Sequence, residues 1–343
     1  MPHSGFKTAF AALFLCAIAL LALLAGCAAP GKTPPGSQNF STLPPPKVSV
    51  ATATPSPLPP TSTALPTRMP PTGTSMPPVS VEVISLYSNY LGYNRPVTVY
   101  LPGEYPNLPE KRYKVLYAND GQDLREIVFE LYLNSLVAAR QVEPVIVVAI
   151  PSNDNRLYEY GTGPVESVDG WGTLAQAYNN YIVRELKPLI DSKYRTLTGP
   201  ENTAFMGWSL GGLSAFYLVW QYPADFGIVG AFSPSFWWRT NQNSLQELLA
   251  SRVIHKLVRE SPKRPGMKMW FEAGTADETN DRDKNGVIDA IQDITDLMDE
   301  LGKKGYKPEI DMKLVVVPGG RHELATWTTV LPEFLRWAFP FKK

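Results

Sequence analysis

The amino-acid sequence predicts an α/β fold in which a mostly parallel central sheet of about eight strands carries helices on both faces. Short β-branched runs alternate with longer segments whose apolar residues recur at helical spacing, which is the pattern of βα units. The run VIVVAI at 145–150 is apolar at every position, as a strand covered on both faces should be. The stretch from Ser80 to Lys343 is long enough for one large core.

Eight segments fit strands and six fit helices. The first two strands are expected to form a hairpin and the others to belong to βα units. In such sheets, ligands bind beyond the carboxyl ends of the strands, so the loops at those ends are where functional residues are expected. The predicted strands are 81–86, 97–101, 114–118, 145–150, 203–207, 228–233, 268–272 and 313–317, and the predicted helices are 123–139, 173–191, 209–221, 244–260, 287–303 and 325–337.

Residues 1–26 have the features of an export signal peptide. Lys7 precedes an apolar stretch at 9–25, which is a little shorter than the about 20 residues that a transmembrane helix needs. The stretch ends in LAGC at 24–27, which is similar to the lipobox of bacterial lipoproteins. We therefore expect cleavage before Cys27, lipidation of its thiol, and an extracytoplasmic protein anchored to the cell membrane. An ordinary cleaved signal and an uncleaved anchor are the alternatives.

Residues 27–79 differ in composition from the rest of the chain. They contain fifteen prolines, many serines and threonines, and no acidic residue. Such a segment cannot bury enough apolar surface to fold, so we expect a disordered tether, with about 3.1 Å per residue where it is polyproline-like. The folded domain is then 80–343. The chain has two cysteines, Cys16 in the predicted signal peptide and Cys27 at the predicted cleavage site, so the domain itself has no cysteine and no disulfide.

The charge of the predicted domain argues against one class of partner. All 32 acidic residues lie within 80–343, together with 28 of the 32 basic residues. The domain is therefore slightly acidic, whereas proteins that bind nucleic acid present a clustered positive surface. We expect no nucleic-acid partner, and the sequence leaves the oligomeric state open.

A serine at the centre of the domain is the first candidate for chemistry. Residues 207–211 have the spacing G-x-S-x-G, which alone occurs by chance in roughly one chain in ten of this length. The context is more specific, because the apolar run TAFMG precedes Ser209 and a run with helical spacing follows it. A sharp strand-to-helix turn exposes a serine hydroxyl, and we therefore predict Ser209 as a nucleophile.

A serine nucleophile needs a general base, and the chain has three histidines. His3 lies in the signal peptide, and His255 lies in an ordinary amphipathic segment. His322 follows the last predicted strand on a glycine-rich loop, at the edge where chemistry is expected. This position predicts His322 as the base.

The predicted base should be oriented by an acid that lies between Ser209 and His322 in the sequence. The loop after the seventh predicted strand, FEAGTADETN, offers Asp277, which we prefer. Glu278 and Glu272 remain as alternatives.

Two backbone N–H groups are expected to stabilise the oxyanion of the reaction. Leu210, directly after the nucleophile, should supply the first. The second should come from the loop YANDGQDL after the third predicted strand, where Gly121 allows close approach and Gln122 donates. A tight Asp-Gly turn without this role is the alternative for that loop.

With these residues in place, the domain resembles the α/β-hydrolases of the Putative esterase family, which includes siderophore, feruloyl and acetylxylan esterases, S-formylglutathione hydrolases and mycolyltransferases. The resemblance covers 83–340. It implies an α/β-hydrolase fold without a large lid, and a serine carboxylesterase that forms an acyl-enzyme without an organic cofactor. The matching stretches are RPVTVYLPGEY, YKVLYANDGQ, IPSNDNRLYEY, ELKPLIDSKYRT, GWSLGGLSAFYLVWQYPADFG, SPSFWW and GGRHELATW.

The expected substrate is a small-molecule or glycan-linked ester, and siderophore, feruloyl and acetyl esters all remain open. Trp237 and Trp238 are predicted to offer aromatic faces to an aryl acyl group, although tryptophans at a strand end also occur as core residues. Arg156 is a candidate for contact with an anionic substrate, with an ion pair to Glu159 as the alternative. An acyltransferase of the same fold and a non-catalytic tethered binding protein are the competing functions.

One loop has the spacing of a calcium site. The segment DRDKNGVIDAIQ at 281–292 matches an EF-hand loop at positions 1, 3, 5, 6 and 9, with Gly286 at the sixth position, but Gln292 stands at position 12 instead of a bidentate glutamate. We therefore expect a structural calcium ion that is weakly bound, with an acidic turn as the alternative. The candidate ligands are Asp281, Asp283, Asn285, Val287 and Asp289.

Overall fold

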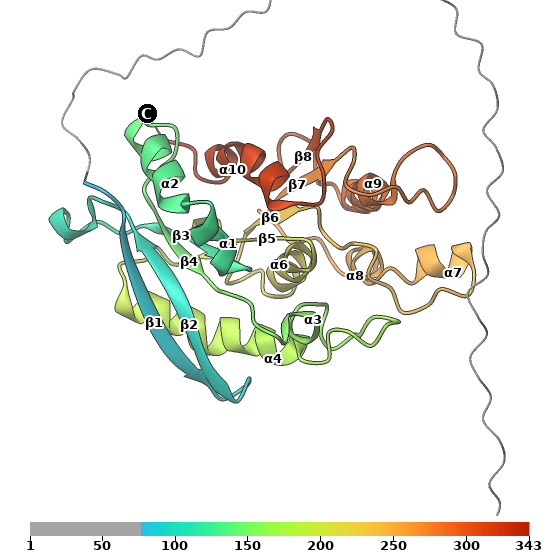
Figure 1. The fold of residues 1–343 in the computed structure, drawn as a ribbon, viewed down its shortest axis with the longest axis horizontal. Coiled ribbons are helices and arrows are strands. Elements are labelled where there is room, and N and C mark those ends of the chain that lie inside the picture. Colours follow the sequence, from blue (N-terminus) through green and yellow to red (C-terminus); the bar gives the residue numbers. More distant parts are fainter. Residues whose placement is uncertain (1–76, 343) are drawn as a thin grey trace, which may run out of the picture. The chain divides into compact units, whose positions relative to one another are not determined.

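A computed structural model describes residues 77–342 of the chain. The strands in these residues are β1 (Ser80–Ser88), β2 (Tyr93–Leu101), β3 (Lys114–Ala118), β4 (Val145–Ala149), β5 (Thr203–Trp208), β6 (Ile228–Phe232), β7 (Lys268–Gly274) and β8 (Met312–Val317). They form one sheet in the order β1-β2-β4-β3-β5-β6-β7-β8 (Figure 1). β2 is antiparallel to both β1 and β4, and all other neighbours are parallel. The predicted α/β class with a mostly parallel sheet is confirmed.

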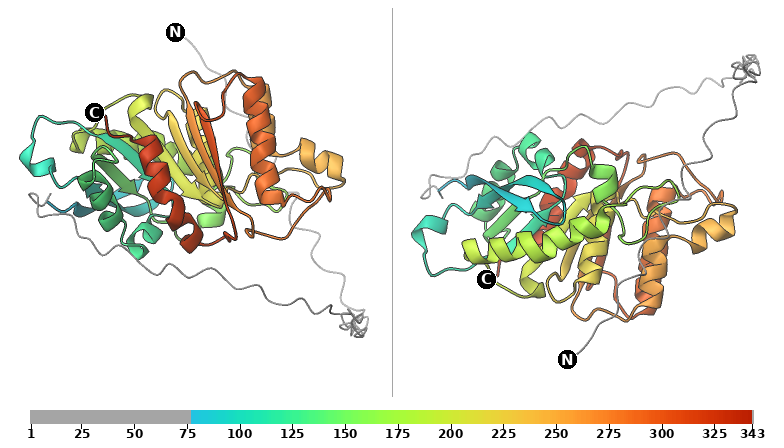
Figure 2. Two further views of the ribbon diagram at one scale, coloured as in Figure 1. Left: turned by 90° about the horizontal axis from the view of Figure 1, so that it is seen from above. Right: turned by 90° about the horizontal axis from the view of Figure 1, so that it is seen from below.

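Helices cover both faces of this sheet (Figure 2). The helices are α1 (Gly121–Glu126), α2 (Phe129–Ala138), α3 (Arg156–Glu159), α4 (Ala175–Asn180), the π-helical η2 (Tyr181–Leu186), α5 (Lys187–Lys193), α6 (Leu210–Gln221), α7 (Leu245–Ala250), α8 (Val253–Glu260), α9 (Asp289–Lys303) and α10 (Leu324–Ala338), with short 3₁₀ turns η1 (Tyr105–Asn107) and η3 (Pro200–Asn202). One apolar cluster joins the sheet to α1, α2 and α10, and a second joins it to α4–α5, α6, α8 and α9.

The central strand β4 shows how one run of residues supplies both apolar clusters. Val147 belongs to the cluster with α2 and α10, whereas Val148 belongs to the cluster on the opposite face. Successive side chains of a strand point to opposite faces, so a strand buried on both faces must be apolar at every position. All five residues of β4 are buried.

Three of the predicted helices are interrupted. The predicted helix 123–139 is divided at Val128, whose φ of 54° is rare for a β-branched residue. The predicted helix 244–260 is divided into α7 and α8 by the extended residue Arg252, and 173–191 contains the π-helical turn η2. Apolar spacing does not reveal the irregularities at Val128 and at η2, because the helices on both sides of each still bury residues, whereas α7 buries none.

The carboxyl ends of β3, β5, β7 and β8 lie at one edge of the sheet, because these strands are parallel. The loops that follow them carry the residues predicted to take part in chemistry. In residues 77–342, no helix combines the length and apolar character needed to cross a membrane. The predicted signal peptide, Cys27 and the tether up to residue 76 lie outside the described residues.

Candidate active site

Ser209 forms the turn between β5 and α6. Its φ of 56° and ψ of −126° lie outside the conformations of regular strands and helices. Two backbone hydrogen bonds hold this turn, because Ser209 N–H donates to the carbonyl of Phe232 (2.9 Å) and its own carbonyl accepts from Ser235 N–H (3.1 Å). The half-buried serine therefore sits on the sharp strand-to-helix reversal that the sequence predicts.

The glycines around Ser209 are required by close packing. A Cβ on Gly207 would lie 2.4 Å from the carbonyl oxygen of Gly211, and a Cβ on Gly211 would lie 2.7 Å from Asp120 Oδ2. Asn119 Nδ2 also donates to the Gly211 carbonyl at 2.8 Å. The first turn of α6 thus packs directly against the loop after β3, and only glycine fits at this contact.

Two backbone donors lie close in sequence to the residues of this contact. Gln122 and Leu210 lie in the first turns of α1 and α6, where N–H groups have no intrahelical acceptor. Within residues 77–342, neither N–H group has a hydrogen-bond acceptor. The Gln122 side chain is bonded to Ser152, with Nε2 donating to Oγ (3.0 Å) and Oε1 accepting from N–H (2.9 Å). The backbone N–H of Gln122 is thus the group that is available to a ligand.

His322 and Asp277 are in direct contact. His322 Nδ1 lies 2.7 Å from Asp277 Oδ1, and the Asp277 side chain is fully buried while that of His322 is 43% exposed. Because Nδ1 is bonded to the carboxylate, Nε2 is the nitrogen available to exchange a proton. Glu278 instead accepts from Asn280 Nδ2 (2.8 Å). Of the three acids considered, Asp277 is the one that the fold brings to the histidine.

A pair of tryptophans connects the serine turn with the histidine loop. Trp208 stacks on Trp327, with ring centroids 5.5 Å apart and an interplanar angle of 12°. Trp327 also meets the His322 ring edge to face at 5.2 Å, and Trp208 Nε1 donates to Asp123 Oδ2 in α1 (2.7 Å). Within the described residues, no hydrogen bond joins Ser209 Oγ to His322. Such catalytic bonds often tighten only when substrate binds.

These tryptophans were not predicted as site residues. Each lies near a predicted site residue in the sequence. Trp208 directly precedes Ser209, and Trp327, which lies on α10, comes five positions after His322. Adjacency is a weak signal, because a tryptophan beside a strand end is also common in cores.

Arg156 forms a bidentate ion pair with Asp120, with both N–O distances 2.8 Å. The predicted alternative, a pair between Arg156 and Glu159, is wrong because Glu159 pairs with the buried Arg95 (2.7 Å). Asp120 has a φ of 52° and immediately precedes α1. Arg156 thus fixes the backbone that leads to Gln122, and its charge is already compensated. Contact between Arg156 and an anionic substrate stays a prediction.

The two tryptophans predicted to contact substrate have different surroundings. Trp238 is fully buried, and its Nε1 donates to the Val165 carbonyl (3.4 Å). Its ring packs so closely on Gly172 that a Cβ there would lie 2.7 Å from Cζ2. A ring without an exposed face cannot stack on a ligand, so the prediction for Trp238 is wrong. Trp237 is half-buried and meets Trp171 edge to face at 6.1 Å, and its contact with substrate stays a prediction.

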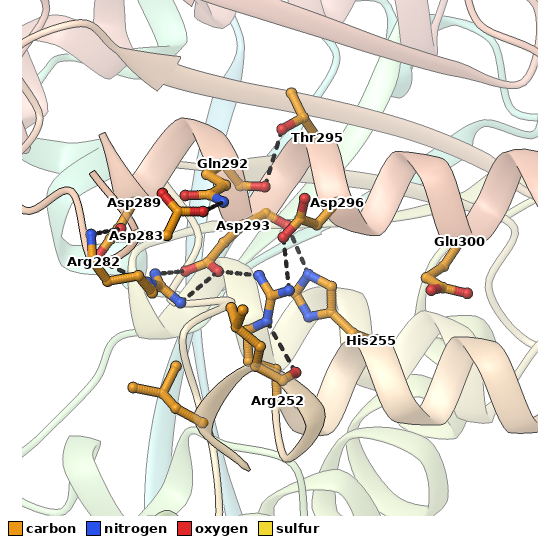
Figure 3. Close-up of polar contacts among 12 residues, drawn as sticks. Arg252, His255, Arg282, Asp283, Asp289, Gln292, Asp293, Thr295, Asp296 and Glu300 are labelled. Carbon is orange, nitrogen blue, oxygen red and sulfur yellow. Dashed lines mark hydrogen bonds and ion pairs between the residues drawn. The ribbon is translucent and has the colours of Figure 1, made fainter. Parts of the chain in front are cut away.

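The loop predicted to bind calcium makes its polar contacts within the protein. Arg282 pairs with Asp289 (Nε–Oδ2, 2.9 Å) and with Asp293 (Nη2–Oδ2, 2.6 Å), and Gln292 Nε2 donates to Asp283 Oδ2 (2.7 Å) (Figure 3). Between residues 77 and 342, no group of three or more His, Cys, Asp or Glu side chains is arranged to hold a metal ion. Asp289, the predicted ninth-position ligand, is instead neutralised by an arginine.

Calcium binding by this loop stays a prediction. Asp281 accepts from the N–H groups of Asn285 (3.0 Å) and Gly286 (2.9 Å), and Asn285 Oδ1 accepts from Val287 N–H (2.8 Å). A weakly bound ion would stabilise the folded state by mass action. We therefore expect millimolar calcium to raise the melting temperature modestly relative to chelator, and a variant with Asp281→Ala and Asp283→Ala to show no such rise. Identical wild-type curves would contradict the prediction.

His255 belongs to the contact between α8 and α9 and not to the site. It is buried, and its Nε2 lies 2.8 Å from the Asp293 carbonyl (Figure 3). Burial and the nearby charge of Arg252 together lower the pKa of His255 to about 3. The ring is therefore neutral at pH 7, and His322 is the histidine that lies at the catalytic edge.

The sheet order, the serine turn after β5 and the His–Asp contact after β7 and β8 define an α/β-hydrolase. Residues 88–338 match the family described as Putative esterase, and the chain belongs to this family. The resemblance stated from the sequence is confirmed, and the chain is a carboxylic ester hydrolase.

Three proteins show how far the likeness extends. The chain is 30% identical over 251 residues to the uncharacterized protein YbbA of Bacillus subtilis, which covers 72% of this chain and 93% of that protein. The enterobactin esterase of Shigella flexneri superposes with a TM-score of 0.60 at 21% identity over 76% of this chain and 59% of that one. A ferulic acid esterase of Anaeromyces mucronatus superposes with a TM-score of 0.56 at 20% identity over 77% and 92%. At these identities, the two solved structures support the fold alone.

Proposed function

We propose that the chain hydrolyses a carboxylic ester through an acyl-enzyme on Ser209. His322 Nε2 takes the proton of Ser209 Oγ as the oxygen attacks the ester carbonyl, and then gives that proton to the departing alcohol. His322 next takes a proton from the water that attacks the acyl-enzyme, and it returns this proton to Ser209 Oγ as the bond to the acyl carbon breaks and the acid leaves. The observation that carries this proposal is the 2.7 Å contact of His322 Nδ1 with the buried Asp277, at the edge of the sheet where the Ser209 turn lies.

Two groups would act on charge that develops during these steps. Asp277 holds the imidazole in place and stabilises its charged form. The N–H groups of Gln122 and Leu210 donate to the carbonyl oxygen as it becomes an oxyanion, and the loss of one such donor typically costs about 10²- to 10³-fold in kcat. The close packing of Gly211 on the loop after β3 supports a shared position for both donors.

We propose an ester with an aromatic acyl group as the substrate. The half-buried Trp237 and its neighbour Trp171 support this choice, because exposed aromatic faces bind aromatic groups by stacking. Sequence relatives named endo-1,4-beta-xylanase/feruloyl esterase and iron(III) enterobactin esterase support the same class. Acetyl and glycan-linked esters are the other candidates.

A screen of aromatic-acid, acetylated-sugar and catechol-siderophore esters tests the proposed activity and substrate class together. We expect the esters of aromatic acids to be hydrolysed with the highest kcat/KM, and a higher KM for these esters in Trp237→Ala. Transfer of the acyl group to an added alcohol in preference to water would identify an acyltransferase. A folded wild-type protein that hydrolyses none of these esters would contradict the proposal and favour a binding protein.

We propose that the mature protein begins at a lipidated Cys27 and is held at the outer face of the cell membrane. The sequence LAGC at 24–27 supports this proposal, and one acyl anchor needs a free thiol at the new N-terminus. The wild-type protein should partition into the detergent phase and carry a lipid mass on its N-terminal peptide, and Cys27→Ser should abolish both. A soluble product cleaved at another position would contradict the proposal.

A further inference from the structure

Glu272 is a second buried carboxyl group in the neighbourhood of Asp277. It lies near the carboxyl end of β7, and its side chain is fully buried. The Ser233 hydroxyl lies 3.4 Å from Glu272 Oε2, and Ser233 N–H donates to the Glu272 carbonyl (2.8 Å). Glu272 Oε1 and Asp277 Oδ2 are both buried without a hydrogen-bond partner in the described residues. Buried polar atoms are rarely left in this state, so the group requires a physical explanation.

The environment of Glu272 favours its neutral form. Burial and the negative charge of Asp277 together raise the pKa of Glu272 to about 8, against the opposing effect of the hydrogen bonds from Ser233. The titratable group near Glu272 is the Asp277 carboxylate, which is itself in contact with His322. The other polar groups on this side are the Ser233 hydroxyl and the Trp327 indole bonded to it, and neither titrates at these pH values. Burial and the neighbouring Asp277 thus favour the protonated form of Glu272 at pH 7, and this form can donate a hydrogen bond.

Ser233 links this acid to the tryptophan pair of the site. Trp327 Nε1 donates to Ser233 Oγ at 2.9 Å, which leaves the Ser233 hydroxyl hydrogen free to point to Glu272. Ser233 has a φ of 40°, a conformation that persists only where surrounding contacts hold it. Trp327 in turn contacts His322 and stacks on Trp208. A continuous chain of contacts therefore runs from Glu272 to the catalytic histidine and to the residue before the nucleophile.

We propose that Glu272, as a neutral acid, is a positioning residue of the active site. With Ser233 it fixes the ring of Trp327, and by staying uncharged it leaves Asp277 as the one carboxylate that acts on His322. This inference rests on the function proposed above. Ionisation of Glu272 places a second negative charge near Asp277 without a compensating cation, which loosens the contact of Asp277 with His322. Activity therefore falls as Glu272 loses its proton.

The test compares wild type, Glu272→Gln and Glu272→Met as full-length chains, with 4-nitrophenyl acetate as the probe between pH 6 and pH 9.5. The wild-type kcat should fall above pH 8 by up to about tenfold per pH unit, as expected for one ionisation. Glutamine keeps the size and hydrogen bonding of the neutral acid, so kcat at pH 7 should stay near the wild-type value and the decline above pH 8 should vanish. Methionine removes the oxygen that accepts the hydrogen bond of Ser233 Oγ. We therefore expect kcat to fall about tenfold with KM unchanged, as is typical when a residue that orients a functional group is lost.

A melting series provides an independent readout. The folded state retains the proton of Glu272 up to about pH 8, whereas the unfolded chain loses it near pH 4.5. The contribution of Glu272 to the free energy of unfolding is therefore fully present below about pH 4.5 and is lost as the pH rises to about 8. The melting temperature of the wild type should fall across this window more steeply than that of Glu272→Gln. Equal slopes would contradict a neutral buried acid at Glu272.

Two results would overturn the inference: a wild-type kcat that is flat from pH 7 to pH 9.5, or a decline above pH 8 that persists unchanged in Glu272→Gln. Ser209→Ala is measured in parallel to separate the two proposals. If Ser209→Ala remains active, the proposed function fails whatever Glu272 does. If Ser209→Ala is inactive while Glu272→Gln matches the wild type at every pH, only the present inference fails. Should Glu272→Met not fold, the glutamine comparison decides alone.

Discussion

Replacement of Ser209 by alanine is expected to lower kcat for ester hydrolysis by about 10⁴- to 10⁶-fold. The reason is that Oγ is the atom proposed to form the covalent bond to the acyl group, and no other group of the site can supply it. The small remaining rate would come from the backbone donors and from substrate binding. Stability should be nearly unchanged, because the turn at Ser209 is held by backbone hydrogen bonds to Phe232 and Ser235.

Ser214→Ala is the matched control for this variant. Ser214 lies on the same helix α6 and is buried, so it reports the effect of removing a serine hydroxyl from this helix. It should keep the wild-type kcat. Initial rates with the best ester from the screen, together with melting curves, measure both effects. A Ser209→Ala variant with more than a few per cent of wild-type activity would contradict the acyl-enzyme on Ser209.

Replacement of His322 by alanine is expected to be nearly as damaging as the loss of Ser209, and the double variant should be hardly worse than either one. The groups act as a unit, because a serine without its base is a poor nucleophile and a base without a nucleophile has nothing to activate. Asp277→Asn should lose less, since the amide still fills the buried site but no longer stabilises the charged imidazole. Single-turnover and steady-state rates measure the three variants.

Glu278→Gln is the control for the acid assignment. Glu278 contacts Asn280 and not His322, so this variant should keep near-full activity. Additive losses in the Ser209 and His322 double variant would show that the two residues do not work together. Near-full activity in Asp277→Asn with a large loss in Glu278→Gln would show that the acid is Glu278.

The sheet could be predicted because burial leaves a local record in each strand. A strand covered on both faces is apolar at consecutive positions, and β4 has this pattern. The serine turn could be predicted for a similar reason. Gly207 and Gly211 are in contact and leave no room for a side chain, so the turn requires glycine at both positions. His322 and Asp277 followed from the order of loops along the chain. These features depend on short stretches of sequence, and the structure brings His322 and Asp277 into contact as expected.

Other features depend on contacts between residues far apart in the chain, which leave no periodic pattern. Trp327 bonds to Ser233, 94 positions away, and stacks on Trp208, so neither its position nor the role of Glu272 could be read from the sequence. The error on Trp238 has the same origin, because adjacent tryptophans give no sign of which ring is enclosed. The break at Val128 also reflects local backbone geometry that apolar spacing does not encode.

Labelling with a fluorophosphonate, followed by mass spectrometry of the peptides, tests whether Ser209 is the activated nucleophile. The reagent bonds covalently to a serine that is activated by a neighbouring base, and it requires no knowledge of the natural ester. We expect one adduct, on the peptide that contains Ser209, in the wild type and in Ser214→Ala, with no adduct on that peptide in Ser209→Ala and much slower labelling in His322→Ala. A folded wild-type protein that stays unlabelled, or an adduct on a different serine, would contradict it.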